Sequence, residues 1–454
     1  MPTRLLSALL ALLVAAPAFA QVAGTEDAVP EGFRPYTRPF ALVGGRVETV
    51  TNGTLERATV VIRDGRIEAV GPDVAIPPDA EVIDVAGLTL YPGMIDAGTR
   101  LGLQEIGSSE ETQDFDEVGN FTPHVEALTA VNPNSVLIPV TRVGGVTTVL
   151  AVPQGGTMPG TAALVDLFGY TPEQMDAGFR GVVLEWPSSL KRGGFDRRTP
   201  EKIAEAYEEA VEGIDQLWRE AAVWARADSA HRADGRNTSA TFQPEAAALA
   251  PVLRGERLLL VQVDRAPDIV NALAWLARYP RVRAALVGVA EGWRVADRIA
   301  AAGLPVVTGP VLALPSRGGD RYDRPYTNAG LLHRAGVQVS LRTNDAENVR
   351  NLPFHAGFAA AYGAEHGFDR QAALAAVTIN TARLFGVDDR LGSIEVGKEA
   401  TLFVADGDPF EPATHIQHLF IRGWHLPLTS RQTELYDEFL HRATGVGPEA
   451  GGER

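Results

Sequence analysis

The stretch TLYPGMIDAGTRLGL, residues 89–103, determines how the rest of the chain is interpreted. It rises through apolar residues, turns at a Pro-Gly pair and continues as a second apolar run that ends in Asp96. Polar positions that directly follow a buried strand lie where α/β proteins form their pockets. Side chains two residues apart share one side of a strand, so Gly98 and Arg100 decide what this strand end can bind.

Downstream of this stretch, strand-like and helix-like segments alternate from residue 92 to about residue 385. The longest helical pattern begins at Pro200 and continues to about Ala227, with apolar residues along one side. Near-continuous apolar runs, typical of parallel strands covered on both faces, lie at residues 145–153, 180–187, 257–264, 283–290, 304–311 and 336–345. This alternation predicts an α/β fold, either a (β/α)8 barrel or a doubly wound sheet.

Short strands with turn signals flank this region at both ends. The Asp-Gly pair in RDGR, residues 63–66, predicts a hairpin turn, and residues 391–410 show the same strand-and-turn pattern. The two flanking segments are expected to complete one small composite β-sandwich, with the larger region inserted between them. The predicted divisions are a signal peptide at 1–20, a linker at 21–38, β-sandwich segments at 39–91 and 386–435, a barrel at 92–385 and a tail at 436–454.

The composition limits the classes of function. With 45% hydrophobic residues among 454, the chain is expected to form a packed globular protein. A net charge of -16 argues against nucleic acid as a partner, because phosphate contacts need a basic face. The absence of cysteine excludes disulfides, thiolate metal ligands and a Cys nucleophile.

The first twenty residues predict an export signal. Arg4 precedes an apolar run at residues 5–16, and the small-residue pattern Ala-Phe-Ala at residues 18–20 predicts cleavage near Ala20. The apolar run is too short for a membrane span, and no later segment of the sequence supplies one. The mature protein is therefore expected in the periplasm or outside the cell.

Three motifs carry a resemblance to a known family: YPGMIDAGTRLGL at residues 91–103, RNLPFHAGFAAAYG at 350–363 and LGSIEVGKEATLFVADGDP at 391–409. On these motifs the chain resembles the amidohydrolase superfamily, particularly its imidazolonepropionase-like branch. The resemblance implies a (β/α)8 TIM-like barrel inserted in a composite β-sandwich. It also implies hydrolysis of C–N bonds other than peptide bonds, with zinc or another divalent metal activating water at the barrel mouth.

The metal ligands that the resemblance implies are largely replaced in this chain. The superfamily has a His-x-His pair on its first barrel strand, a carbamylated lysine or a glutamate, two further histidines and an aspartate. The matching positions here are Gly98, Arg100, Glu185, Gln262, Gly288 and Asn344, with Asp345 beside the last. Glycine has no ligand atom and arginine is a fixed cation that repels a dication, so we predict no metal cofactor.

Polar side chains still follow the strand ends, and their mixture suits a ligand of carboxylate, amide or zwitterionic character. The candidate ligand-binding residues are Arg100, Glu185, Gln262, Asp264, Arg342, Asn344 and Asp345. In an alternative interpretation, Arg100 fills the space that the metal has left and pairs with Glu185 or Asp345.

These features predict an exported amidohydrolase-related protein with a degraded metal centre. It is expected to bind a small polar molecule or to partner an active relative. The predicted assemblies are a homo-oligomer, or a hetero-oligomer with a metal-bearing relative. The alternative is an active hydrolase of amide or cyclic amide C–N bonds. In that case Asp345 or Glu185 is the candidate general base and Arg100 the group that polarises the carbonyl.

Overall fold

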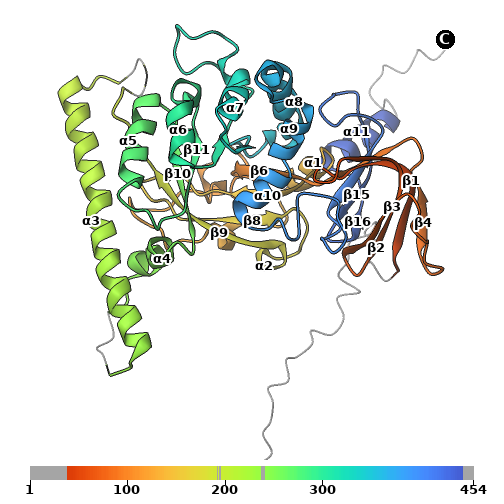
Figure 1. Ribbon diagram of the computed structural model, residues 1–454, viewed down its shortest axis with the longest axis horizontal. Coiled ribbons are helices and arrows are strands. Elements are labelled where there is room, and N and C mark those ends of the chain that lie inside the picture. The colour runs from red at the N-terminus through yellow and green to blue at the C-terminus, as the bar shows by residue number, and fades with distance from the viewer. Residues whose placement is uncertain (1–37, 192, 194–195, 237–240, 443–454) are drawn as a thin grey trace, which may run out of the picture.

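The computed structural model describes residues 38–191, 193, 196–236 and 241–442. The predicted signal peptide, the predicted linker up to residue 37 and the end of the predicted tail lie outside the described residues. Figure 1 shows a barrel with helices on its outer side and a smaller β part at one end of it. Both ends of the chain contribute strands to the smaller part, as the sequence predicted.

The smaller part is one hydrogen-bonded sheet of eight strands. Its N-terminal strands are β1 (Phe40–Glu48), β2 (Thr54–Arg63), β3 (Arg66–Gly71), β4 (Glu81–Asp84) and β5 (Thr89–Pro92), and its C-terminal strands are β14 (Leu402–Ala405), β15 (Ile416–Ile421) and β16 (Trp424–Leu426). Strand β14 pairs with β5 and so joins the two ends of the chain. The predicted hairpin is present, because Asp64 and Gly65 both have the positive φ angles, 49° and 76°, that such a turn requires.

The second sheet curves into a nearly closed barrel, which confirms the barrel over the doubly wound alternative. Its strands are β6 (Met94–Thr99), β7 (Val146–Ala151), β8 (Thr161–Asp166), β9 (Asp176–Glu185), β10 (Leu258–Val263), β11 (Ala284–Gly288), β12 (Val306–Thr308) and β13 (Val339–Leu341). Strands β13 and β6 come together at the closure, where the Asn344 amide donates to the Gly98 carbonyl at 3.0 Å. Strand β8 differs from the predicted rhythm because it runs antiparallel to both neighbours. Its short connections leave no room for the helical crossover that a parallel strand needs.

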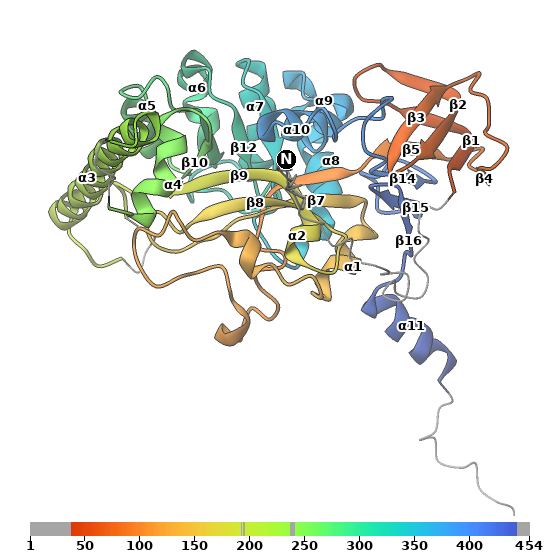
Figure 2. The same ribbon diagram turned by 90° about the horizontal axis from the view of Figure 1, so that it is seen from below.

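All helices but the last surround the barrel and its connections, whereas the last helix projects away from it beyond the smaller β part (Figure 2). The helices are α1 (Leu137–Arg142), α2 (Pro172–Met175), α3 (Pro200–Ala233), α4 (Pro244–Leu253), α5 (Ala266–Leu276), α6 (Ala296–Ala302), α7 (Arg324–Arg334), α8 (Leu352–Gly363), α9 (Arg370–Ala376), α10 (Ile379–Phe385) and α11 (Arg431–His441). Helix α3 begins where predicted, at the Thr199 cap, but extends past Ala227. Helix α11 continues into the predicted tail as far as His441. None of the helices in the described part of the chain is long and apolar enough to cross a membrane.

Apolar side chains fill the interior of the barrel and leave one end for chemistry. Ile95, Leu150, Val183 and Leu260 point into this interior and are 0–1% exposed. Side chains of α10, including Phe385, belong to the same cluster and close the N-terminal end of the strands. The interior is therefore packed, and space for a ligand is confined to the opposite, C-terminal end.

Candidate functional site

The candidate site lies at the C-terminal ends of the barrel strands, and strand periodicity explains why its side chains converge. Val183 and Leu260 face the barrel interior, and the residues two positions later, Glu185 and Gln262, face the same way. Gln154 follows strand β7, and its side-chain amide donates to Asn344 Oδ1 at 3.3 Å. Side chains from separate strands therefore meet above the apolar interior.

The C-terminal ends of the barrel strands surround the mouth of the barrel. A hydrogen-bonded chain of three side chains forms the floor of this mouth. Arg342 Nη1 donates to Gln262 Oε1 at 2.7 Å, and Gln262 Nε2 donates to Glu185 Oε1 at 2.6 Å. Arg342 is only 4% exposed and Gln262 only 8%. Cation and anion are thus bridged by a neutral amide, and the structure brings these three of the predicted site residues together.

The Arg342 side chain occupies the space between two positions that carry histidine in the superfamily pattern. A Cβ atom added to Gly98 would lie 3.2 Å from Arg342 Cδ. A Cβ atom added to Gly288 would lie 3.2 Å from Arg342 Nη2 and 2.4 Å from Asp264 Oδ1. Gly288 also has a φ of +88°, which side chains rarely adopt. The space between the two glycines is therefore filled by an arginine, and larger side chains would collide with it.

Asp96 lies beside this arginine and is fully buried. Its carboxylate accepts hydrogen bonds from the Gly98 amide at 2.9 Å and from the Thr343 hydroxyl at 2.5 Å. Burial raises the pKa of Asp96 to about 7, although the hydrogen bonds and the positive charge of Arg342 act in the opposite direction. Asp96 therefore connects the ends of β6 and β13, and its protonation changes around neutral pH.

Burial and neighbouring acids have opposite effects on the pKa of Arg342. Burial lowers the pKa of its guanidinium, whereas Asp264, Glu185 and Asp96 raise it. An arginine keeps its proton in proteins, so Arg342 is a buried cation with three carboxylates around it. This is the electrostatic arrangement that was expected of Arg100.

Arg100 and Asp345 lie together, but outside the mouth. The Arg100 guanidinium lies over the ring of Phe115, 5.1 Å from its centroid, and its charge acts on Asp345. The Asp345 carboxylate accepts from the amides of Glu347 and Asn348 at 2.7 and 2.8 Å. Burial raises the pKa of Asp345, but these amides and Arg100 outweigh it, so the pKa is below its usual value. Neither residue belongs to the cavities described next.

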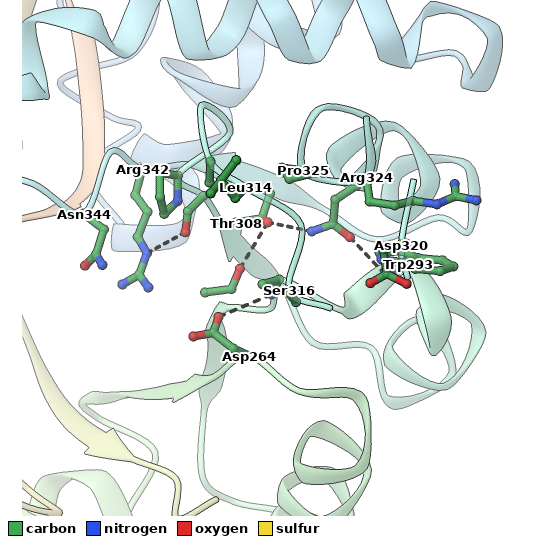
Figure 3. Close-up of a pocket in the computed structure, with 16 residues that line it drawn as sticks. Asp264, Trp293, Thr308, Leu314, Ser316, Asp320, Arg324, Pro325, Arg342 and Asn344 are labelled. Atoms are coloured by element: carbon green, nitrogen blue, oxygen red, sulfur yellow. Dashed lines mark hydrogen bonds between the residues drawn. The ribbon is translucent and has the colours of Figure 1, made fainter. Parts of the chain in front are cut away.

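Two adjoining cavities open at the mouth. The outer cavity has a volume of about 520 Å³, and the residues that distinguish it include Gln154, Glu185, Ser188, Lys191, Gln262 and Asp268. The inner cavity has a volume of about 120 Å³ and lies under the 309–323 loop, where it is lined by Trp293, Thr308, Ser316, Asp320, Arg324 and Asn328. Asp264, Arg342 and Asn344 line both cavities and form the wall between them. Figure 3 shows the inner cavity with Arg342 and Asn344 on one side and Trp293 and Asp320 on the other.

Ionic contacts hold the 309–323 loop over the inner cavity. Arg317 donates to both carboxylate oxygens of the fully buried Glu291 at 2.6 and 2.5 Å. The Val311 amide donates to Nδ1 of His355 at 3.1 Å, and burial lowers the pKa of this histidine to about 4. His355 therefore stays neutral at ordinary pH and continues to accept this bond.

The mouth does not fit a divalent metal of the superfamily type. Within the described ranges, no group of three or more His, Asp or Glu side chains is arranged to hold a metal ion. Gly98 and Gly288 offer no ligand atoms, and Arg342 places a positive charge between them. Glu185 is the acid that the pattern retains, and its carboxylate is engaged by Gln262.

Several residues of the mouth were not found by sequence reasoning. Gln154 follows a predicted strand, and the rule that identified Gln262 also applies to it. Lys191, Trp293 and Asp320 come from loops, and nothing in their local sequence indicated that they would reach the strand ends.

Comparisons with known proteins agree with this architecture. The sequence profile of the amidohydrolase family matches residues 326–426. The imidazolonepropionase of Micrococcus luteus is 28% identical over 401 residues, which cover 80% of this chain and 92% of that protein. A dihydroorotase of Mycobacterium tuberculosis is 49% identical, but over only 49 residues, so the match spans 11% of the length of each protein.

The fold also matches solved structures. The crystal structure of an amidohydrolase from Thermotoga maritima superposes with a TM-score of 0.74, covering 85% of this chain and 99% of that chain at 23% sequence identity. At this identity the match carries information on the fold alone. The profile match, the long alignment with an imidazolonepropionase and the barrel with its composite β sheet agree with one another. Together these findings support the amidohydrolase superfamily as the family that this chain resembles.

Proposed function

We propose that this protein is a metal-independent amidohydrolase relative that binds a small polar molecule at the mouth of its barrel. The observation that carries the proposal is the position of Arg342, whose side chain fills the space between Gly98 and Gly288. A fixed cation at this point repels a dication and offers hydrogen-bond donors in its place. The chemistry of the mouth is therefore recognition by charge and hydrogen bonds.

The outer cavity has the groups needed to hold a ligand with a carboxylate or an amide. Arg342 and Lys191 are cations at its walls, and Gln154 and Asn344 add amide groups. Glu185 supplies an acceptor, with its orientation fixed by Gln262 at 2.6 Å. Pockets that combine a few oriented polar groups with a concave surface are the usual sites for small molecules.

Metal analysis and ligand binding together test the proposal. Purified full-length protein is expected to contain far less than one equivalent of zinc or another divalent metal by mass spectrometry. Carboxylates, amides and cyclic amides, including hydantoins and lactams, are then screened by thermal shift and calorimetry. Binding of at least one such class supports the proposal, whereas stoichiometric metal contradicts it. Turnover of a bound amide would instead favour the alternative of an active hydrolase.

Export is a separate part of the proposal and rests on the sequence of residues 1–20. Expression of the full chain in a bacterium with two membranes, followed by fractionation, tests it directly. A mature N-terminus at Gln21 in the periplasmic fraction is the expected result. Recovery of uncleaved protein in the cytoplasm would contradict this part and leave the ligand-binding part intact.

A further inference from the structure

We propose that the wall between the two cavities is a binding site for the head group of a free α-amino acid. In this arrangement Asp264 binds the ammonium group and Arg342 binds the carboxylate of a head group that lies in the cavities both side chains line. The inference rests on the proposed function and names the class of ligand for the same site.

The distance between the two charged groups is the first argument. Asp264 Oδ1 and Arg342 Nη2 lie 2.4 Å and 3.2 Å from the same point, the Cβ position that Gly288 lacks, so they are at most about 5.6 Å apart. Within the described residues, no ion pair or hydrogen bond joins the two side chains. The two groups are thus close enough to be bridged but do not neutralise each other by contact.

An amino-acid head group can bridge groups at this separation from the cavity side, lying beside the line between them and not along it. Its ammonium nitrogen and its carboxylate carbon are attached to one carbon and lie about 2.5 Å apart. Charge-assisted hydrogen bonds of about 2.8 Å on either side allow the head group to connect a carboxylate with a guanidinium. A simple carboxylate would satisfy Arg342 alone, and a simple amine would satisfy Asp264 alone.

The hydrogen bonds already made at the wall leave these groups available. Asp264 accepts one weak bond, from the Ala290 amide at 3.3 Å, and in the described part of the chain it has no cationic partner in contact. Arg342 uses Nη1 for Gln262 and makes a long contact of 3.4 Å from Nε to the Gly309 carbonyl. Its Nη2 faces the gap beside Gly288. One acceptor and one donor group therefore point to the same small space.

The inner cavity adds a further acceptor near the wall. The Asp320 side chain is 9% exposed; its Oδ1 accepts a hydrogen bond from Arg294, and its buried Oδ2 has no hydrogen-bond partner among the described residues. Both cavities carry charges of both signs, so Asp264 and Arg342 at the wall, and not the cavities as wholes, orient the head group. Side chains larger than the inner cavity of about 120 Å³ then extend into the outer one of about 520 Å³.

Calorimetry on the full-length protein tests the inference with matched probes. The panel consists of the free L-amino acids, their N-acetyl derivatives, which lack the ammonium group, and their amides, which lack the carboxylate. At least one free amino acid is expected to bind, and each derivative of it is expected to bind about 10-fold more weakly or worse. Asp264→Asn is expected to weaken the free amino acid about 10-fold and to leave the N-acetyl derivative unchanged. Asp297→Asn, at an exposed position on α6 that lines neither cavity, is the control and should change neither.

The outcomes separate this inference from the proposed function. Equal affinity for free and N-acetyl amino acids, unaffected by Asp264→Asn, would overturn the head-group site while the mouth still binds a carboxylate. Absence of binding by every carboxylate and amide tested would overturn the proposed function as well. Asp264 is exposed, so its substitution is expected to leave the protein folded, and a thermal melt of each variant checks this.

Discussion

Arg342→Met removes the cation at the centre of the mouth and keeps most of the aliphatic volume, so it isolates the role of the charge. The variant loses the 2.7 Å hydrogen bond to Gln262, a contact with a charged donor worth about 1.5–3 kcal/mol. It also leaves Asp96, Asp264 and Glu185 without the cation that acts on all three. Removing one partner from a buried charge arrangement costs about 3–5 kcal/mol.

Two effects reduce this cost in the present site. Burial disfavours the Arg342 charge, and the variant recovers that penalty. Gln262 stands between Arg342 and Glu185, so no direct ion pair to Glu185 is broken. We therefore expect Arg342→Met to lower the free energy of unfolding by about 2–4 kcal/mol at pH 8. Arg100→Met is the matched control, because it removes a cation outside the buried chain of hydrogen bonds: it loses a cation–π contact with Phe115, worth about 0.5–1 kcal/mol, and the charge that acts on Asp345.

The dependence of this cost on pH provides a second check. The pKa of Asp96 is raised to about 7 by burial, and Arg342 acts to lower it, so removal of Arg342 moves this pKa further upward. When folding raises the pKa of a carboxyl group, the folded state holds the proton more tightly than the unfolded state does. The resulting stability is present at low pH and is lost as pH rises through the folded-state pKa. The cost of Arg342→Met should therefore be larger at pH 8 than at pH 5, where Asp96 is protonated in both proteins. Urea denaturation at both pH values measures this, and a cost below about 1 kcal/mol at pH 8, or equal to that of Arg100→Met, would refute the reasoning.

Three further predictions follow from buried groups. Because the pKa of Asp96 is raised to about 7, the free energy of unfolding of the wild type should fall as pH rises towards 8. Asp96→Asn should lack this part of the pH dependence in urea titrations. An unchanged dependence on pH would contradict the raised pKa of Asp96. The pKa of His355 is lowered to about 4 by burial, so its stabilising contribution is complete above pH 6.5 and is lost as pH falls through about 4; its ring signals in NMR should not titrate between pH 8 and pH 5. Gly288→Ala should destabilise the protein more than Gly303→Ala does. Both glycines have positive φ, but only a Cβ atom at 288 collides with a neighbour, at 2.4 Å from Asp264 Oδ1. Equal midpoints of the two variants in thermal melts would argue against a crowded mouth.

Strand patterns made much of the fold and part of the site accessible from the sequence. The apolar runs predicted the parallel strands, and the structure brings together three polar residues predicted at their ends, Glu185, Gln262 and Arg342. Strand β8 was missed because it is fully buried, so no alternation marks it, and because the connection to β9 contains only the four-residue helix α2. Its antiparallel direction depends on pairing with β7 and β9, and local sequence does not encode that pairing.

The positions of long side chains were harder to infer than the positions of strands. Arg100 and Arg342 both follow strand ends, and their sequence contexts are equally compatible with a place at the centre of the mouth. Packing decides between them: Phe115 offers a surface for one guanidinium, while Gly98 and Gly288 leave room for the other. Contacts of this kind join residues far apart in the chain, so they follow from the closed barrel and not from local spacing.

Gly98, Gly288 and Arg342 depend on one another. A Cβ atom at either glycine position would lie 3.2 Å from an atom of Arg342, so a larger residue at 98 or 288 requires the arginine side chain to move. The charge of Arg342 is in turn stabilised by Asp264, Glu185 and Asp96, which oppose the effect of its burial. Small residues at 98 and 288 and the three acids therefore favour a guanidinium at this point together. Under the proposed function, this covalently attached cation supplies the positive charge that holds an anionic ligand.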